Sequence, residues 1–452
     1  MSPPDRRTFL KNSAVVAAGL SAFPAAASSI KALSDKVRVG IIGTGMRGRS
    51  LLDILLRRDD VEITALCDID EDALAQANEM LSEEGKADPG LYSESEDAWR
   101  EMLEKTEMDA VIIATPWTLH APMAKLAMEN SLYVGVEVPV ALTVEDCMEL
   151  VAVSERTGMP CMMLENVCYR RDVMAIMNMA RKNMFGELVH MECGYQHDLR
   201  EVKFNDGKQP YGGGVEFGEQ GYSEARWRTN HALHRNGDFY PTHGIGPVSM
   251  MLDINRGNRF LSVSSFATKS RGLREYIVAQ ASEDHPHASL EWKLGDVVTS
   301  MLQTSKGETV MIQHDTSLPR PYSLGFRVQG TKGLWMAVNK SLHIEGVTEA
   351  HRWADAQPFL DEHDHPLWKR YAEDSKGAGH GGMDFFVIHA FVESVKAGTQ
   401  TPIDVYDSVT WSAIVELSEQ SIQQGGSPIP FPDFTGGQWV NRKNTFALDD
   451  TY

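Results

Sequence analysis

Short apolar runs alternate with helical periodicity through the first third of the chain. Uninterrupted apolar runs predict strands buried on both faces, at residues 37–42, 61–67, 109–114, 132–136 and 160–164. The intervening segments carry apolar residues at helical spacing, at 50–58, 73–81, 96–104, 121–130 and 143–157. This alternation predicts an α/β fold whose N-terminal part is a doubly wound parallel sheet.

After residue 166 the pattern changes. A Met-rich helix is predicted at 169–184, and residues 187–196 alternate between apolar and polar as a half-buried strand does. Further strands are predicted at 260–267, 297–303, 309–314, 324–329 and 334–337, and a returning helix at 405–423. The glycine- and aromatic-rich stretch 204–224 predicts a long loop near a functional site. We expect a C-terminal α+β domain with an open, mostly antiparallel sheet at 166–452, beside the parallel-sheet domain at 34–165.

A glycine-rich turn directly follows the first predicted strand. It contains Gly43, Gly45, Met46, Arg47 and Gly48, and Asp68 ends the second strand. The glycines allow a tight turn and let the backbone approach a pyrophosphate. A carboxylate at the end of the second strand accepts hydrogen bonds from adenosine ribose hydroxyls and repels a 2′-phosphate. The sequence therefore predicts a dinucleotide site that takes NAD rather than NADP.

Ligands of parallel α/β sheets lie beyond the carboxyl ends of the strands. Three segments follow predicted strands at this position: Thr115–His120, Glu137–Pro139 and Glu165–Asn166. We expect all three near the nicotinamide half of the cofactor.

Composition narrows the class of partner. The 452 residues include 63 acidic and 43 basic side chains, a formal net charge of −20. Nucleic acid and anionic membranes would repel such a chain, so neither is expected as a partner. The five cysteines show no CxxC spacing, which favours buried reduced thiols over a disulfide framework or a zinc site. His363 and His365 stand beside acids, where a solvated loop is favoured over a metal site.

The N-terminus has the pattern of an export signal. Arg6-Arg7 precede an uncharged, Ala-rich stretch at 12–27 that is too short to span a bilayer. The arginine pair followed by Thr-Phe-Leu-Lys resembles a twin-arginine signal. We expect residues 1–33 to direct export to the periplasm or cell envelope, and a disordered tail is the alternative.

The order of these motifs resembles the Gfo/Idh/MocA oxidoreductase superfamily, and within it glycoside hydrolase family 109. The matching stretches cover nearly all of the chain after the signal. They include Thr115–His120, Leu164–Tyr169, Gly194–Arg200, Tyr240–Gly244, Asp253–Gly257, His314-Asp315, Pro319–Tyr322, Gly379–Asp384 and Pro432–Thr435. Sugar dehydrogenases of the superfamily carry Glu-Lys-Pro where this chain has Glu137-Val138-Pro139. They also carry Asp four residues before the catalytic His, where this chain has Phe239. Both departures favour the hydrolase family.

The resemblance implies a retaining, NAD-dependent exo-glycosidase acting on terminal N-acetylgalactosamine. In that scheme NAD⁺ takes hydride from C3 of the sugar, the C1–O bond breaks by elimination, water adds at C1, and the hydride returns. NAD is regenerated in each cycle and should stay bound. NAD-dependent glycosidases are exceptions to the scheme with two carboxylates.

The resemblance also assigns residues. His243 is expected to relay the C3 hydroxyl proton, because an imidazole accepts and returns a proton near neutral pH. Tyr195 is a candidate for the C2 proton or the leaving-group oxygen, with substrate binding as a competing role. Substrate contacts are expected from Arg228, Tyr240, Pro241, Thr242 and Tyr322. Cofactor contacts are expected from Trp117, Thr118, Leu119, His120, Glu137, Val138 and Asn166. His197, Asp198 and Arg200 either support the site or form a local salt bridge.

Two other functions stay open on the sequence. One is an NAD-dependent sugar dehydrogenase, and the other is a catalytically inactive NAD-bound sugar-binding protein. The sequence does not fix the anomer, since elimination through a planar C1–C2 alkene does not demand one. An exposed sheet face makes a homo-oligomer an expectation in this superfamily.

Overall fold

The computed structural model describes residues 36–452. The predicted export signal at 1–33 lies outside the described residues. Residues 36–452 belong to one compact unit with two sheets. The first sheet is built from residues before position 166 and the second from residues after it. The two-domain boundary itself stays a prediction.

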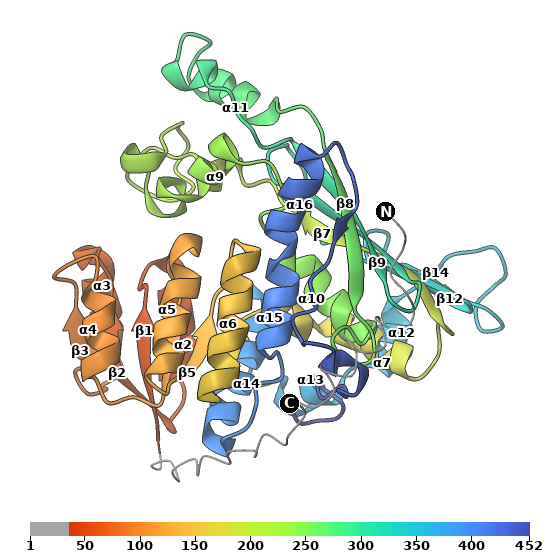
Figure 1. Ribbon diagram of the computed structural model, residues 1–452, viewed down its shortest axis with the longest axis horizontal. Coiled ribbons are helices and arrows are strands. Elements are labelled where there is room, and N and C mark those ends of the chain that lie inside the picture. The colour runs from red at the N-terminus through yellow and green to blue at the C-terminus, as the bar shows by residue number, and fades with distance from the viewer. Residues whose placement is uncertain (1–35) are drawn as a thin grey trace, which may run out of the picture. The chain divides into compact units, whose positions relative to one another are not determined.

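The first sheet has six strands in the order β3-β2-β1-β4-β5-β6, and every neighbouring pair is parallel. Its strands are β1 (Val37–Ile42), β2 (Val61–Cys67), β3 (Gly90–Tyr92), β4 (Ala110–Ile113), β5 (Tyr133–Val136) and β6 (Cys161–Met163). The helices are α2 (Met46–Leu56), α3 (Glu71–Glu83), α4 (Ala98–Lys105), α5 (Trp117–Glu129) and α6 (Val144–Thr157) (Figure 1). The predicted parallel sheet is confirmed, and the carboxyl ends of its strands meet at one edge.

Two local features of this sheet differ from the prediction. Strand β3 was not expected, because it is only three residues long and largely exposed, with no apolar run to reveal it. Helix α5 begins at Trp117 rather than at residue 121. Pro122 lies inside the helix, although proline is commonest in the first helical turn, so it conceals the earlier start. The segment 117–120 is therefore helical and not a loop.

The second sheet has nine strands in the order β14-β13-β12-β11-β7-β10-β9-β8-β15. They are β7 (Leu188–Gln196), β8 (Phe260–Ala267), β9 (Val297–Thr304), β10 (Thr309–Asp315), β11 (Arg327–Gly330), β12 (Gly333–Met336), β13 (Ser341–Ile344), β14 (Ala354–Asp355) and β15 (Ile429–Pro430). Only the β7–β10 pair is parallel among the described strand pairs of this sheet. The predicted open, mostly antiparallel sheet is confirmed. Strands β13 to β15 were not predicted, and β14 and β15 are too short, at two residues each, to show an alternating pattern.

The remaining helices follow the first sheet in the chain. They are α7 (Arg171–Arg181), α8 (Arg200–Lys203), α9 (Arg228–His234), α10 (Thr242–Met251), α11 (Gly272–Gln280), α12 (Gln357–Glu362), α13 (Pro366–Tyr371), α14 (Met383–Ala397), α15 (Val405–Ser412) and α16 (Ile414–Gln423). Two of them, α14 and α15, pack back on elements of that first sheet. The predicted helix at 169–184 is a 3₁₀ turn, η1 (Asn166–Tyr169), followed by α7, because Arg170 between them is extended. The predicted helix at 405–423 is two helices that meet at Ala413.

Helix α10 is the element that the sequence conceals most completely. It is buried over almost its whole length and contains two glycines and Pro247, so it shows neither an amphipathic period nor strong helix formers. It packs on β7. A Cβ atom added at Gly244 would lie 2.6 Å from the Gly194 nitrogen, so glycine permits this close approach of α10 to β7.

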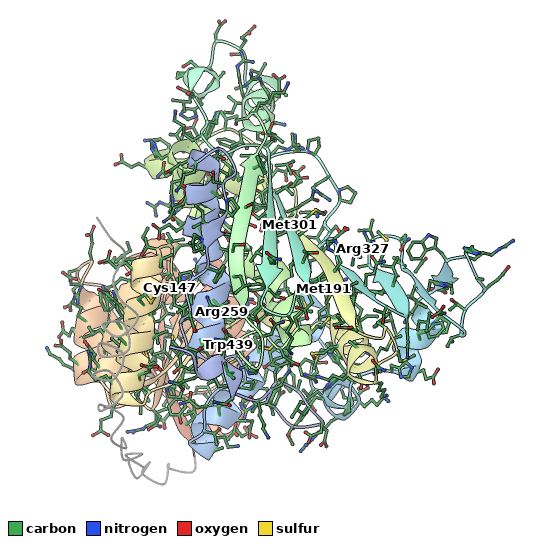
Figure 2. The ribbon with its side chains drawn as sticks, turned by 45° about the vertical axis from the view of Figure 1, so that its right-hand side comes forward. Cys147, Met191, Arg259, Met301, Arg327 and Trp439 are labelled. Carbon is green, nitrogen blue, oxygen red and sulfur yellow. The ribbon has the colours of Figure 1, made fainter. Side chains whose placement is uncertain are left out.

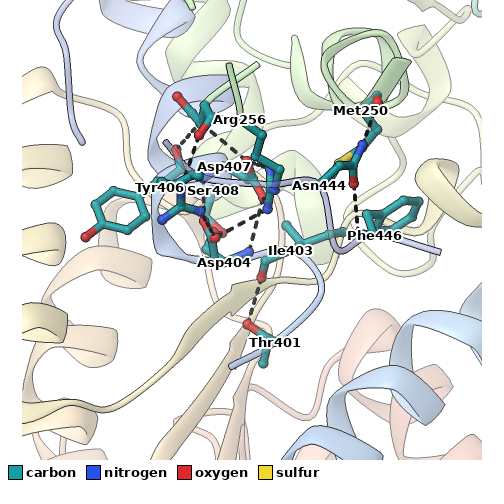
Figure 3. Close-up of polar contacts among 12 residues, drawn as sticks. Met250, Arg256, Thr401, Ile403, Asp404, Tyr406, Asp407, Ser408, Asn444 and Phe446 are labelled. Atoms are coloured by element: carbon teal, nitrogen blue, oxygen red, sulfur yellow. Dashed lines mark hydrogen bonds and ion pairs between the residues drawn. The ribbon is translucent and has the colours of Figure 1, made fainter. Parts of the chain in front are cut away.

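A buried ion pair fixes the chain beyond α10. The Arg256 guanidinium donates to both oxygens of Asp407, each at 2.6 Å, and Asp404 lies 3.3 Å away (Figure 3). Asp404 also caps α15 by accepting from the Asp407 backbone nitrogen. The pair therefore joins the loop after α10 to the first turn of α15. Arg256 of the Asp253–Gly257 motif thus has a structural role in this loop.

One row of side chains crosses the second sheet on its exposed face. Pairing across β8, β9, β10, β7 and β11 aligns Ser264, Met301, Met311, Glu192 and Arg327. Met301 is 42% exposed, and Arg327 forms an ion pair with Glu192 at 2.7 Å. Figure 2 labels Met301 and Arg327 on this sheet.

Candidate active site

The glycine turn between β1 and α2 has the geometry expected of a dinucleotide site. Gly43 has a φ of +88°, and a Cβ atom there would lie 2.6 Å from the Ala114 carbonyl oxygen. A Cβ atom at Gly48 would lie 1.9 Å from the Gly43 oxygen, whereas Gly45 faces open space. The first and last glycines thus allow close packing, and Gly45 leaves its side of the turn free for a ligand.

Asp68 lies directly after β2 and braces this turn. Its Oδ2 accepts from the Thr44 backbone nitrogen at 2.6 Å and from the Thr44 hydroxyl at 3.2 Å. Its Oδ1 accepts from the Asp70 nitrogen at 2.9 Å. A carboxylate has about four lone-pair positions, so it retains capacity to accept from ribose hydroxyls. The ribose contact itself stays a prediction.

His120 joins the ends of two strands. Its Nδ1 lies 2.7 Å from the Pro139 carbonyl oxygen and its Nε2 lies 2.8 Å from the Thr115 carbonyl oxygen. Burial lowers the pKa of His120, against the two backbone contacts that raise it. Both ring nitrogens are therefore engaged by the backbone. Thr118 and Leu119 lie in the first turn of α5, and Val138 is buried beside Glu137.

Three predicted cofactor residues meet around one buried carboxylate. Arg47 donates through Nε to Glu137 at 2.6 Å and through both terminal nitrogens to Asp384, at 2.7 and 3.1 Å. The Asn166 amide nitrogen also donates to Asp384, at 2.7 Å. The Asn166 Oδ1 is buried and has no hydrogen-bond partner among the described residues. A free buried acceptor beside an open glycine turn fits the binding of a dinucleotide carrying a carboxamide.

His243 lies at the start of α10 and contacts Glu165. Its Nδ1 is 2.7 and 2.9 Å from the two Glu165 carboxylate oxygens, and Glu165 is fully buried directly after β6. The Val167 backbone nitrogen donates to Glu165 at 3.1 Å and fixes it further. Since Nδ1–H donates to the carboxylate, Nε2 is the nitrogen left to exchange a proton. The sequence placed Glu165 only in a segment near the cofactor and missed this role.

Asp238, the acid nearest to His243 in the preceding loop, has a different function. It is buried, its Oδ1 accepts from the Tyr240 backbone nitrogen at 3.1 Å, and burial raises its pKa to about 7. It therefore shapes the loop before α10, whereas Glu165 is the carboxylate that orients the imidazole.

Aromatic rings surround His243. The Tyr195 ring centroid lies 5.4 Å from His243 and 4.6 Å from Tyr240, and Tyr240 lies 4.8 Å from His243. Burial raises the pKa of Tyr195 well above its ordinary value, although Arg228 opposes the shift. The Tyr195 hydroxyl lies 3.2 Å from His197 Nδ1, and burial lowers the pKa of His197. Tyr195 is thus a hydrogen-bond donor rather than a phenolate near neutral pH.

Arg228 connects these rings to Trp117. Its guanidinium lies 4.9 Å from the Trp117 ring centroid and 5.2 Å from that of Tyr240, and its Nε lies 2.7 Å from Glu224. Trp117, predicted among the cofactor residues, therefore contacts the predicted substrate residues. Tyr322 is 48% exposed, and its ring lies 5.0 Å from His197.

The two residues between Tyr240 and His243 form the start of α10. Pro241 is the N-cap residue. Thr242 is fully buried, and its hydroxyl has no hydrogen-bond partner among the described residues.

Two further polar residues line the cavity beneath these rings and were not predicted. Burial lowers the pKa of Lys203 to about 7, and its ammonium donates to Thr316 and Ser317 at 2.8–3.0 Å. His314 is buried with its Nδ1 unpartnered among the described residues, and burial lowers its pKa to about 3. Asp198 and Arg200 form a local bidentate salt bridge, one of the two alternatives that the sequence left open.

The described residues contain no cluster of His, Cys, Asp or Glu suited to a metal ion. The expected solvated loop is wrong for His365, which is buried. It caps α13 by accepting from the Leu367 nitrogen, and its Nε2 lies 3.0 Å from the Ala447 carbonyl oxygen. No helix within residues 36–452 is both long and apolar enough to cross a bilayer.

Comparison with known proteins agrees with this geometry. Residues 37–165 match the family model of the oxidoreductase family, NAD-binding Rossmann fold, and residues 169–441 match the glycosyl hydrolase 109 C-terminal domain. A glycosyl hydrolase family 109 protein of Stenotrophomonas maltophilia is 55% identical, with 99% of each chain covered. An alpha-N-acetylgalactosaminidase of Tannerella forsythia is 49% identical, over 91% of this chain and 89% of that one.

The fold also has solved neighbours. The structure of an NAD binding oxidoreductase from Klebsiella pneumoniae superimposes with a TM-score of 0.65 at 16% identity, covering 88% of this chain and 100% of that one. The two family models match both halves of the chain, and they confirm the resemblance inferred from the motifs. The chain belongs to glycosyl hydrolase family 109, a glycoside hydrolase family, and its first sheet is an NAD-binding Rossmann fold.

Proposed function

We propose that this chain is a retaining exo-glycosidase that releases terminal N-acetylgalactosamine by transient oxidation at C3. The observation that carries the proposal is the buried Glu165–His243 contact, because it leaves one imidazole nitrogen free within a ring of Tyr195, Tyr240 and Arg228. The relative from Tannerella forsythia named alpha-N-acetylgalactosaminidase supports the sugar assignment.

NAD, when bound, supplies the hydride acceptor and donor for C3 of the sugar. His243 takes the C3 hydroxyl proton through Nε2 and later returns it, while Glu165 holds the ring and balances the charge that forms. Oxidation at C3 acidifies the hydrogen at C2, so C2 gives its proton to water while the C1–O bond breaks and the leaving oxygen takes a proton. Water then adds its oxygen to C1, C2 regains a proton from solvent, and C3 regains its hydride.

Tyr195 fits the leaving-group side of this scheme. Because burial keeps the Tyr195 phenol protonated, it can donate to the glycosidic oxygen as the C1–O bond breaks. It is poorly suited to abstract the C2 proton for the same reason. The sugar hydroxyls or the acetamido group are proposed to be bound by Arg228, Tyr240 and Tyr322. The guanidinium and the two phenols of these residues can all donate hydrogen bonds.

The sugar dehydrogenase remains the second candidate, because the solved neighbours of this fold include an oxidoreductase. The Glu137-Val138-Pro139 triplet disfavours it, since Val138 is buried and has no side-chain group to move a hydroxyl proton.

A glycosidase that regenerates its bound NAD in each cycle should need no added cofactor. The purified chain should release 4-nitrophenol from 4-nitrophenyl α-N-acetylgalactosaminide without added NAD and without net NADH.

The β-linked substrate is assayed in parallel, because elimination through a planar alkene permits activity on it too. Steady NADH formation from free sugars with added NAD⁺, and no release from either glycoside, would favour the dehydrogenase. Absence of both activities in NAD-loaded protein would favour a sugar-binding protein.

The dyad is tested by substitution. His243→Ala should lower kcat by at least about 100-fold, the usual contribution of a positioned general acid–base group. Glu165→Gln keeps a hydrogen-bond acceptor but loses the balancing charge, so kcat should fall by about tenfold or more with little change in KM. Asp238→Asn is the matched control and should stay near the unsubstituted rate. Equal losses in Asp238→Asn and Glu165→Gln would show that His243 does not depend on Glu165.

We further propose that residues 1–33 direct export of the folded chain to the periplasm or cell envelope, on the strength of the Arg6-Arg7 pair. Replacing both arginines by lysine keeps the charge but removes the pair that the export machinery reads. The variant should accumulate unprocessed in the cytoplasm of a host with that machinery. Unchanged export in cell fractionation would contradict the proposal.

Self-association is proposed for the exposed face of the second sheet. The exposed Met301 pairs across the strands with the half-buried Met311, and the Glu192–Arg327 pair flanks them. An exposed thioether suits an apolar contact. Sedimentation of the purified chain should give a multiple of the chain mass, and Met301→Asp should shift it toward the monomer. A monomer at all concentrations would overturn this assignment.

A further inference from the structure

The segment Gly379–Asp384 has no role in the scheme above. It contains the turn η5 (His380–Gly382) at the start of α14, and its four residues 379–382 all have positive φ. His380 adopts a φ of +43°, which is uncommon for a residue with a side chain. Such backbone persists where the surrounding structure holds it, and here the hold is the contact between the His380 Nδ1 and Asp384 at 2.7 Å.

Asp384 is the centre of this segment. Its side chain is fully buried and accepts from three residues that are distant in sequence or strained: Arg47, Asn166 and His380. Burial works to raise the pKa of Asp384, but the His380 hydrogen bond and the Arg47 charge outweigh it and hold the pKa well below its usual range. The carboxylate is therefore ionised and fully engaged at neutral pH.

The partners of Asp384 come from separate elements at the edge of the Rossmann sheet. Arg47 belongs to the glycine turn and α2, Glu137 follows β5 and is tied through Arg47, and Asn166 follows β6. Burial works to lower the pKa of Arg47, and the charges of Glu137 and Asp384 raise it above its usual value. One carboxylate on α14 thus fixes three residues that were assigned to the cofactor independently of it.

We propose that Asp384 is a positioning residue that retains NAD in the site between turnovers. With Asp384 ionised, Arg47 and Asn166 are held in one arrangement before the cofactor binds, so binding does not have to order them. Without that charge, Arg47 keeps only Glu137 as an ionic partner, and one of the two oxygens that hold Arg47, Asn166 and His380 no longer accepts. Bound NAD then dissociates faster, although no contact between Asp384 and NAD is required. This role rests on the proposed function, because only a cofactor that is regenerated in each cycle has to stay bound over many cycles.

The test measures NAD release and not hydrolysis. The unsubstituted protein and Asp384→Asn are loaded with NAD and separated from free nucleotide. Each is then diluted, and the NAD still bound is quantified against time after denaturation. Loss of a charge-assisted bond network should raise the dissociation rate of Asp384→Asn by at least about tenfold.

Asp407→Asn is the matched control. Asp407 is also a buried carboxylate held bidentately by an arginine, Arg256, but it joins α15 to the loop after α10 (Figure 3). It should lower the melting temperature without changing the NAD release rate. Equal acceleration in both variants would mean that general loosening of the fold releases NAD, and it would overturn the proposal.

His380 gives a second pair of variants that spares the buried carboxylate, because its side chain is 58% exposed. His380→Ala should also speed NAD release, and His380→Asn should restore slow release, since asparagine tolerates left-handed backbone and carries a donor. Unchanged release rates in both Asp384→Asn and His380→Ala would overturn the proposal.

The outcomes separate this proposal from the proposed function. Slow NAD release by the unsubstituted protein that Asp384→Asn accelerates supports the positioning role even if no glycoside is hydrolysed. Hydrolysis by a protein whose NAD release Asp384→Asn leaves unchanged would retain the proposed function and reject the role of Asp384.

Discussion

The contact between Glu165 and His243 joins the two halves of the chain at the point where chemistry is proposed. Glu165 stands at the end of the last strand of the parallel sheet, and His243 stands on a helix that packs against the second sheet. A fully buried carboxylate is costly unless it is paired and hydrogen-bonded, so Glu165 constrains where the imidazole can lie. The close approach of α10 to β7, which Gly244 permits, then brings His243 against Tyr195.

Two separate arginine groups lie near this contact. Arg47 lies between Glu137 and Asp384, among residues predicted to bind the cofactor. Arg228 lies over Trp117 and Tyr240 and pairs with the partly exposed Glu224. Burial raises the pKa of Tyr195 and Tyr240, whose rings lie against His243. A protonated phenol at Tyr195 and an imidazole oriented by Glu165 suit the proposed elimination followed by water addition.

The sequence predicted the fold class and the NAD-binding domain correctly because both depend on local patterns. The strand at 37–42, the glycines at 43–48 and the acid at 68 are close in sequence and carry a known spacing. Glu165 and Asp384 could not be assigned roles in this way, since their partners are 78 and 337 residues away. Helix α10 was missed because it is buried on all sides. Phe239 and Val138 also helped the prediction. They stand where the sugar dehydrogenases of the superfamily carry an aspartate and a lysine, so they favoured the hydrolase family over a dehydrogenase.

The most direct test of the account is hydrolysis of an N-acetylgalactosaminide in D₂O, followed by mass and NMR analysis of the released sugar. Elimination across C1–C2 with later reprotonation predicts deuterium from solvent at C2, and return of the same hydride predicts that C3 keeps its original hydrogen. Released sugar without deuterium at C2 would contradict the account, because it would indicate direct displacement at C1 with no role for the proton relay at His243.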